Sequence, residues 1–151
     1  MIRKWWSLTR LLAVIALMLA VVPVAADEPA SDSERHKEIL KERLADAKSQ
    51  VAGMSVDQLA AMMDTCQSLR IVDVRTEEEY QAGHLRGALW MPRGKLEWGG
   101  AFGKIGSPTD QIVVYCRKDG RACLSAVTLH DLGFESTRYL TGGFKAWAEA
   151  G

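Results

Sequence analysis

The sequence has few of the residues from which metal sites and disulfide scaffolds are built. Its 151 residues include three cysteines and three histidines. The histidines are not spaced like metal ligands, so no metal site is expected. An odd number of cysteines leaves at least one thiol outside any internal disulfide. Because 48% of the residues are hydrophobic, the chain can build a core without disulfides, and its length predicts about one domain.

The sequence also lacks an excess of either charge. It has 19 basic and 19 acidic residues. Removing the first 26 residues takes away Arg3, Lys4 and Arg10 and no acidic residue, which leaves a net charge of −3. General nucleic-acid binding requires a basic face, so this charge balance excludes nucleic acid as an expected partner. Any attraction for anions must come from a local cluster of basic residues.

No apolar run reaches the length of about 20 residues that a membrane-spanning helix usually needs. The N-terminus has positive residues, then an apolar stretch over residues 11–22, then small residues at Val24, Ala25 and Ala26. This order is typical of a secretory signal peptide, so we expect residues 1–26 to be cleaved. The mature protein is then expected in the periplasm or outside the cell, with no stable membrane span. The alternative is that the segment stays uncleaved as an N-terminal membrane anchor.

The mature chain is predicted to have two parts. Residues 27–53 are a polar linker followed by a charged helix over residues 34–50. The helix has a narrow apolar stripe made of Leu40, Leu44, Ala47 and Val51. We expect this stripe to dock on the domain or on a partner. Residues 54–151 form the main domain.

Strand and helix patterns alternate through the main domain. Short apolar runs predict strands at residues 69–74, 88–91, 112–115 and 137–140. Helices are predicted at residues 56–63, 77–81, 122–132 and 144–150. The glycine-rich residues 92–106 are predicted to form an irregular loop. Such alternation indicates parallel pairing. The expected fold class is therefore α/β, with a central, mainly parallel sheet flanked by helices and an N-terminal helical extension.

A cysteine stands where the strand over residues 112–115 ends. Cys116 opens a loop that also contains Arg117, Lys118 and Arg121, and a helix is expected to begin at Ala122. In a parallel sheet this is the preferred position for a ligand. The amides of a helix N-terminus and the basic side chains favour a thiolate and a bound anion.

Two interpretations of this loop stay open on the residues alone. Gly120 is expected to adopt a left-handed backbone angle that turns the loop amides inward around a nucleophilic Cys116. The equal alternative is a buried cysteine beside a surface turn. Cys66 and Cys123 are interpreted as packing residues. A bridge between Cys116 and Cys123 is not expected, because a side chain in the first turn of the helix should face the core rather than the nucleophile.

Three motifs occur in order in the main domain. They are IVDVRTEEEYQAGHLRGA at residues 71–88, IVVYCRKDGR at residues 112–121 and LTGGFKAW at residues 140–147. Together they resemble the first signature, the active-site strand with its six-residue loop, and the closing signature of rhodanese-like sulfurtransferase domains. The resemblance covers about residues 54–151 and implies the rhodanese-like fold. One difference lies in the loop, where many members have glycine third after the cysteine and this chain has Asp119.

The resemblance implies a thiosulfate sulfurtransferase, or rhodanese. Cys116 would take the outer sulfur of a small anionic donor such as thiosulfate, carry it as a persulfide, and pass it to cyanide or a thiol. The implied substrate-binding residues are Arg117, Lys118, Asp119, Gly120 and Arg121. No metal or organic cofactor is implied, and a sulfur-carrier protein is a further candidate partner.

Four matched residues outside the loop are expected to support the site rather than to react. By the same resemblance, Asp73 and Arg75 tie the end of the first strand to the active-site loop. Glu79 is expected to pair with a nearby basic residue. His84 is expected to make a structural hydrogen bond.

Two other functions compete with sulfur transfer. One is a cysteine-loop phosphatase or arsenate reductase. The phosphatase signature places arginine six positions after the cysteine, whereas Arg121 follows Cys116 by five, and the shorter loop suits sulfur better than tetrahedral phosphate. The other is a rhodanese-fold binding or sulfur-relay module without turnover. The presence of Cys116 argues against it, because members that lose catalysis usually lose the cysteine.

Overall fold

The computed structural model describes residues 31–98 and 102–151. Met1–Ser33 and Glu34–Gly151 form two separate units, and the second contains the whole main domain. The predicted signal peptide and the first residues of the predicted linker lie outside the described residues. In the ranges that are described, no helix is long and apolar enough to cross a membrane.

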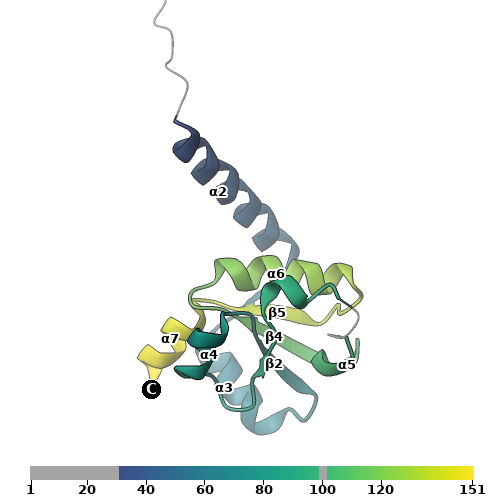
Figure 1. The fold of residues 1–151 in the computed structure, drawn as a ribbon. Helices are drawn as coiled ribbons and strands as arrows, with labels where there is room; N and C mark the ends of the chain where they lie inside the picture. The colour runs from purple at the N-terminus through teal and green to yellow at the C-terminus, as the bar shows by residue number, and fades with distance from the viewer. Residues whose placement is uncertain (1–30, 99–101) are drawn as a thin grey trace, which may run out of the picture. The chain divides into compact units, whose positions relative to one another are not determined.

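Within the described residues, five parallel strands form one sheet in the order β1-β5-β4-β2-β3 (Figure 1). The strands are β1 (Gly53–Met54), β2 (Leu69–Asp73), β3 (Leu89–Trp90), β4 (Gln111–Tyr115) and β5 (Thr137–Leu140). The helices are α2 (Asp32–Gln50), α3 (Val56–Thr65), α4 (Glu77–Gln81), the 3₁₀ turn η2 (Arg93–Lys95), α5 (Phe102–Ile105), α6 (Gly120–Asp131) and α7 (Gly143–Ala150). The prediction of an α/β fold with a mainly parallel sheet is confirmed.

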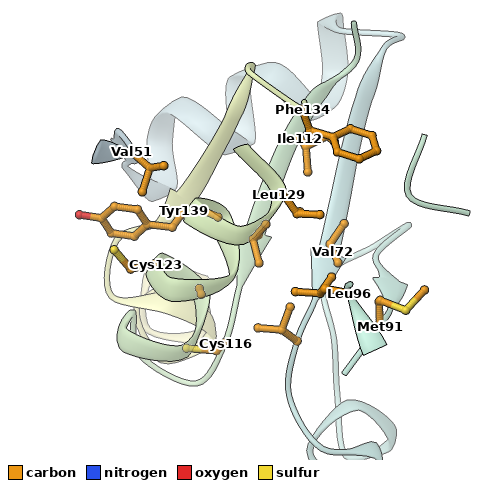
Figure 2. Packing of buried hydrophobic residues seen from close by; sticks show 14 of the residues in the cluster. Val51, Val72, Met91, Leu96, Ile112, Cys116, Cys123, Leu129, Phe134 and Tyr139 are labelled. Carbon is orange, nitrogen blue, oxygen red and sulfur yellow. The ribbon is translucent and has the colours of Figure 1, made fainter. Parts of the chain in front are cut away.

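Each face of the sheet has its own apolar cluster, because successive strand residues point to opposite faces. Ile112 and Val114 of β4 pack with α6 in one cluster, part of which Figure 2 shows. Val113 and Tyr115 pack with residues of α3 and α7 in the other cluster. Helices therefore cover both faces, as Figure 1 shows for α6 and α3. A β4 buried on both faces explains why its sequence is apolar without alternation.

The strand β1 was not predicted. Residues 27–53 were expected to hold only a linker and a helix, but Gly53 and Met54 pair with Tyr139 and Leu140 of β5. The amide of Thr141 donates to the Met54 carbonyl at 2.9 Å. Two residues are too few to show an alternating pattern, so this strand depends on its long-range partner alone.

The prediction of an irregular loop over residues 92–106 is wrong in part. The turn η2 and the short helix α5 lie inside this range. Leu96 and Ile105 are fully buried in the cluster on the α6 side of the sheet. Burial of these two side chains stabilises the turn and the short helix, although the many glycines of this segment predict an irregular loop.

The C-terminal end of α2 packs on the domain. Ala47 and Val51 are buried in the same cluster as Cys123 and Tyr139. Nearer the start of the helix, Leu40 of the same predicted stripe is 52% exposed. Only the last turns of the helix therefore use the stripe for packing against α6 and β5.

Candidate active site

The ends of β2 and β4 meet at the point where the strand order reverses. β3 lies outside β2, whereas β5 lies on the other side of β4. Asp73 at the end of β2 pairs with Tyr115 at the end of β4, directly before Cys116. In open α/β sheets the carboxyl ends of the strands at such a reversal form the usual ligand position. The fold thus places the predicted nucleophile where a site is expected.

The first turn of α7 fixes the backbone around Cys116. The Phe144 amide donates to the Cys116 carbonyl at 2.8 Å, and the Lys145 amide donates to the Arg117 carbonyl at 3.0 Å. In a trans peptide the carbonyl and the following amide point in opposite directions. The amides of Arg117 and Lys118 therefore point away from α7.

This arrangement requires glycine at position 143. Gly143 has φ of +61°, and a Cβ there would overlap the Lys118 carbonyl and lie 2.5 Å from the Cys116 carbonyl oxygen. The closing motif LTGGFKAW thus has a physical reason, since its second glycine lets α7 approach the loop backbone. The paired glycines were the available sequence signal for a close backbone approach.

The loop amides are left without protein acceptors. Among residues 31–98 and 102–151, no hydrogen-bond acceptor faces the amides of residues 117–122. The helix α6 begins at Gly120, two residues earlier than predicted, and Asp119 precedes it without a side-chain capping bond. The thiol of Cys116 is 2% exposed and stands at the start of this row of donors. Such a row can stabilise a thiolate or a bound anion.

The expectation of a left-handed Gly120 is wrong. Among the described glycines, those with positive φ include Gly142 and Gly143 but not Gly120. Gly120 is the first residue of α6 and so has helical geometry. The curvature of the loop comes instead from the hydrogen bonds with α7.

Arg121 is held by Glu79 from α4. Two hydrogen bonds of 2.8 and 2.9 Å join the guanidinium to the carboxylate. The hydrogen bonds from Arg121 lower the pKa of Glu79 to about 2, although its partial burial opposes this shift. The hydrogen bonds with Glu79 raise the pKa of Arg121, and the nearby Cys116 raises it further, although burial of the guanidinium opposes this shift. The ion pair therefore fixes a permanent cation near the cysteine.

Arg117 and Lys118 have a different environment. Both side chains are exposed, and neither has a hydrogen bond or ion pair in the part of the chain that the structure describes. Asp119, by contrast, forms an ion pair of 2.9 Å with Lys48 of α2. Of the charged loop residues, the first two are free to meet an anion from solvent.

Asp73 and Arg75 form a buried ion pair behind the loop. Four hydrogen bonds run from Arg75 to the Asp73 carboxylate, the shortest at 2.7 Å, and Arg75 also donates to the Gly83 carbonyl. The guanidinium lies 4.1 Å from the centre of the Phe144 ring. Burial opposes the charge of Arg75, but its hydrogen bonds with Asp73 raise its pKa. The pair thus links the end of β2 to the helix that supports the loop.

His84 lies on the surface beside α4. Its ring stacks on Tyr80 with 3.9 Å between ring centres, and its Nδ1 lies 3.0 Å from the Tyr80 carbonyl oxygen. In the described residues, no hydrogen bond joins His84 to the cysteine loop. His84 thus contacts Tyr80 of the neighbouring helix α4 rather than the cysteine loop.

The other two cysteines lie apart from this arrangement. All three cysteines are free, and Cys123 is fully buried. Burial raises the pKa of the Cys123 thiol. Cys66 follows α3, with its sulfur 3.5 Å from the Ser68 hydroxyl. Among the described residues, no group of three His, Cys, Asp or Glu side chains could hold a metal ion.

Comparison with known sequences identifies related proteins. A family model for the Rhodanese-like domain matches residues 55–150. Thiosulfate sulfurtransferase 16, a chloroplastic protein of Arabidopsis thaliana, is 33% identical over 94 residues, covering 54% of this chain and 76% of the plant protein. Putative sulfur carrier protein YrkF of Bacillus subtilis is 27% identical over 99 residues, covering 66% of this chain. This chain spans only 52% of the Bacillus protein.

A solved structure from Rhodopseudomonas palustris is also similar. It is described as a protein of unknown function and possible tyrosine phosphatase. It superposes with a TM-score of 0.66 and 28% identity, covering 74% of this chain and 89% of that chain. The similar proteins therefore carry different functional descriptions, and the chemistry has to be argued from the loop itself.

Replacing Gly143 by alanine should destabilise the domain by about 2–4 kcal/mol, through left-handed strain and the loss of the two α7 hydrogen bonds. Gly133→Ala is a matched control, because Gly133 also has positive φ (+93°) but no atom within 4 Å of an added Cβ. The control should cost only about 1–2 kcal/mol. Urea unfolding measures both, and equal losses would contradict the role given to the close approach.

The Glu79–Arg121 pair should give a defined pH dependence of stability. Because the pKa of Glu79 falls from 4.5 to about 2 on folding, its contribution is complete above pH 4.5 and is lost as the pH falls towards 2. Glu79→Gln should lower the melting temperature by roughly 2–5 °C at neutral pH. The difference from wild type should shrink below pH 4.5 and vanish near pH 2.

Glu77→Gln is the control for this experiment, because Glu77 lies in the same turn of α4 and has no ion pair among the described residues. Thermal melts at several pH values should show a smaller difference for this variant. A gap between Glu79→Gln and wild type that persists unchanged at pH 2 would rule out the ion pair as its source.

Proposed function

Because the chain belongs to the rhodanese-like domain family, we propose that it transfers sulfane sulfur through a persulfide on Cys116. The donor is a small anion such as thiosulfate, and the acceptor is cyanide or a thiol. The observation that carries this proposal is the row of loop amides beside Cys116, which have no acceptor among residues 31–98 and 102–151. These donors suit a sulfur anion carried at the end of the cysteine side chain.

In the first step the Cys116 thiolate attacks the outer sulfur of thiosulfate. A bond forms between the cysteine sulfur and the outer sulfur, while the sulfur–sulfur bond of thiosulfate breaks. Its electron pair leaves with sulfite, so the charge of −3 on the two reactants equals that on the persulfide and sulfite together. The negative terminal sulfur of the persulfide then lies where the loop amides can donate to it.

In the second step a nucleophile attacks this terminal sulfur. Cyanide forms thiocyanate, and the electron pair of the broken sulfur–sulfur bond returns to Cys116 as a thiolate. A thiol acceptor would leave as a persulfide in the same way. The enzyme alternates between two covalent states, so ping-pong kinetics are expected.

The basic residues of the loop have different roles in this mechanism. Arg117 and Lys118 are exposed and unpaired in the described part of the chain, so they can attract an anionic donor. Arg121 is held by Glu79 and acts on Cys116 through its fixed charge. A cysteine residue that is only 2% exposed favours small donors over large ones.

The phosphatase alternative is weaker on this geometry. Two of the five N–H donors of Arg121 are occupied by Glu79, which leaves this residue fewer donors for a phosphate. The helix also begins at Gly120, which keeps the loop short. Assays with an aryl phosphate and with thiosulfate plus cyanide separate the two functions directly. A relay module would accept sulfur on Cys116 without turning over in the second assay.

Cys116→Ser should abolish sulfur transfer and leave the melting temperature within a few degrees of wild type, because serine fits the same space. Cys66→Ser is the control and should keep most of the activity, since Cys66 lies between α3 and the start of β2, whereas Cys116 follows the end of β4. Thiocyanate formation gives the rate, and intact mass after incubation with thiosulfate gives the persulfide. Wild-type turnover by Cys116→Ser would overturn the assignment.

Arg117→Ala should raise KM for thiosulfate about fivefold to tenfold and change kcat little, because a charge-assisted contact of about 1–1.5 kcal/mol to the incoming anion is lost. Arg86→Ala is the control, since Arg86 is an exposed arginine paired with Asp64. In wild type KM should also rise with salt as the Debye length shortens from about 30 to about 8 Å. An equal salt response in Arg117→Ala would count against charge recognition by this residue.

A further inference from the structure

The last turns of α2 touch the start of α6, next to the cysteine loop. Ala47 is buried in the cluster that also contains Cys116. The methyl groups of Leu44 lie 3.5 and 3.6 Å from the position that a Cβ on Gly120 would occupy. All of α2 precedes residues 55–150, which match the family model. A segment outside the matched domain therefore contacts the proposed active-site loop.

One polar contact joins the two segments. Lys48 Nζ lies 2.9 Å from Asp119 Oδ2, across 71 positions of sequence. The side chain of Lys48 is 44% exposed and that of Asp119 is 33% exposed, so the pair is only partly screened by solvent. The hydrogen bond with Asp119 raises the pKa of Lys48, which stays a cation. Two side chains with this separation give no signal in the sequence.

The negative charge of Asp119 is unfavourable in this loop, and the positive charge of Lys48 can compensate it. Its carboxylate stands directly before the first turn of α6, in a loop that has to hold anionic sulfur. The groups on which the charge of Asp119 acts include Lys48 of α2, Cys123 of α6 and Tyr139 of β5. Of these, Lys48 alone is a cation. Without it the carboxylate would oppose the field of the loop amides at Cys116.

We propose that Lys48 is a positioning residue of the cysteine loop, which neutralises Asp119 and holds its carboxylate towards α2. The helix before the domain is then part of the electrostatic environment of Cys116. The inference concerns charge at the loop and can be tested without sulfur transfer, while its kinetic consequence rests on the proposed function.

Alkylation of Cys116 with two reagents measures this field. Iodoacetate is an anion and iodoacetamide is neutral, yet both react with the same thiolate. The ratio of their rates therefore cancels changes in thiolate fraction and access, and reports the local potential. In Lys48→Met the ratio of iodoacetate to iodoacetamide rates should fall about threefold, within the range expected for a partly exposed charge pair. Mass spectrometry of the peptide that contains Cys116 separates this thiol from Cys66 and Cys123.

Three further variants make the result specific. Lys48→Arg keeps the charge and should keep the wild-type ratio. Lys41→Met is the matched control, because Lys41 lies on the same helix in an exposed pair with Glu38. Asp119→Asn removes the charge that Lys48 is proposed to neutralise, so adding Lys48→Met to it should not lower the ratio further. Lys48→Gln provides a second neutral variant if Lys48→Met does not fold.

Each outcome decides the proposal. A fall in the ratio that is confined to chains with Asp119 supports it. An unchanged ratio in Lys48→Met, an equal fall in the Asp119→Asn background, or an equal slowing of both reagents would overturn it. If sulfur transfer is real, Lys48→Met should also raise KM for thiosulfate about threefold at unchanged kcat. Failure of sulfur transfer in the wild type would remove that last expectation and leave the alkylation test intact.

Discussion

Two hydrogen bonds from the first turn of α7 set the orientation of the cysteine loop. They draw the carbonyls of Cys116 and Arg117 towards α7, so the peptide amides that follow point the other way. The approach is close enough that only glycine fits at position 143. If these carbonyls pointed away from α7, their partly negative oxygens would face a bound anion in place of the amide N–H groups. The orientation of the loop at the proposed nucleophile thus depends on a contact with α7.

Most charged side chains around this loop are in ion pairs, so the unpaired basic residues determine the net charge of the site. Three ion pairs enclose it, each with one acidic and one basic partner: Asp73–Arg75, Glu79–Arg121 and Lys48–Asp119. Arg117 and Lys118 are the loop charges without such a partner in the described residues. A chain with an acidic balance after residue 26 can therefore still present a positive surface at one place. Two of these pairs join Asp119 and Arg121 to α2 and α4, and the third links the end of β2 to the helix α7 that contacts the loop.

The sequence was informative where the physical signal is local. The runs that form β2 and β4 are short, apolar and bounded by polar residues, and the predicted strands overlap the observed ones closely. The strand β5 matches its prediction at both ends. The carboxyl ends of adjacent parallel strands meet at one edge, so the position of Cys116 followed from its place after β4. The roles of the individual site residues and the export of the chain stay predictions, and residues 1–26 lie outside the described part.

Features that depend on distant partners could not be predicted in this way. β1 exists because β5 offers hydrogen bonds to two residues that have no strand pattern. Gly120 was assigned the conformation needed to curl the loop, whereas α7 supplies that curl from more than twenty positions further along the chain. The contact of Lys48 with Asp119 spans 71 positions. In each case the feature depends on a contact between residues that lie far apart in the sequence.

Two features of this chain meet at one place, the helix before the matched domain and the aspartate of the cysteine loop. The family model begins at residue 55, and the helix before it has no counterpart in that match. Within the loop, Asp119 stands where many rhodanese-like domains have glycine. Lys48 at the end of α2 contacts this aspartate, while Ala47 and Val51 beside it are buried against α6 and β5. An aspartate in an anion-holding loop is unfavourable alone, and a surface helix with one buried turn gains little alone. In this chain the helix covers apolar surface near Cys123 and Tyr139, and its Lys48 supplies the cation that we propose neutralises the aspartate. The extension and the altered loop are therefore best understood as one unit.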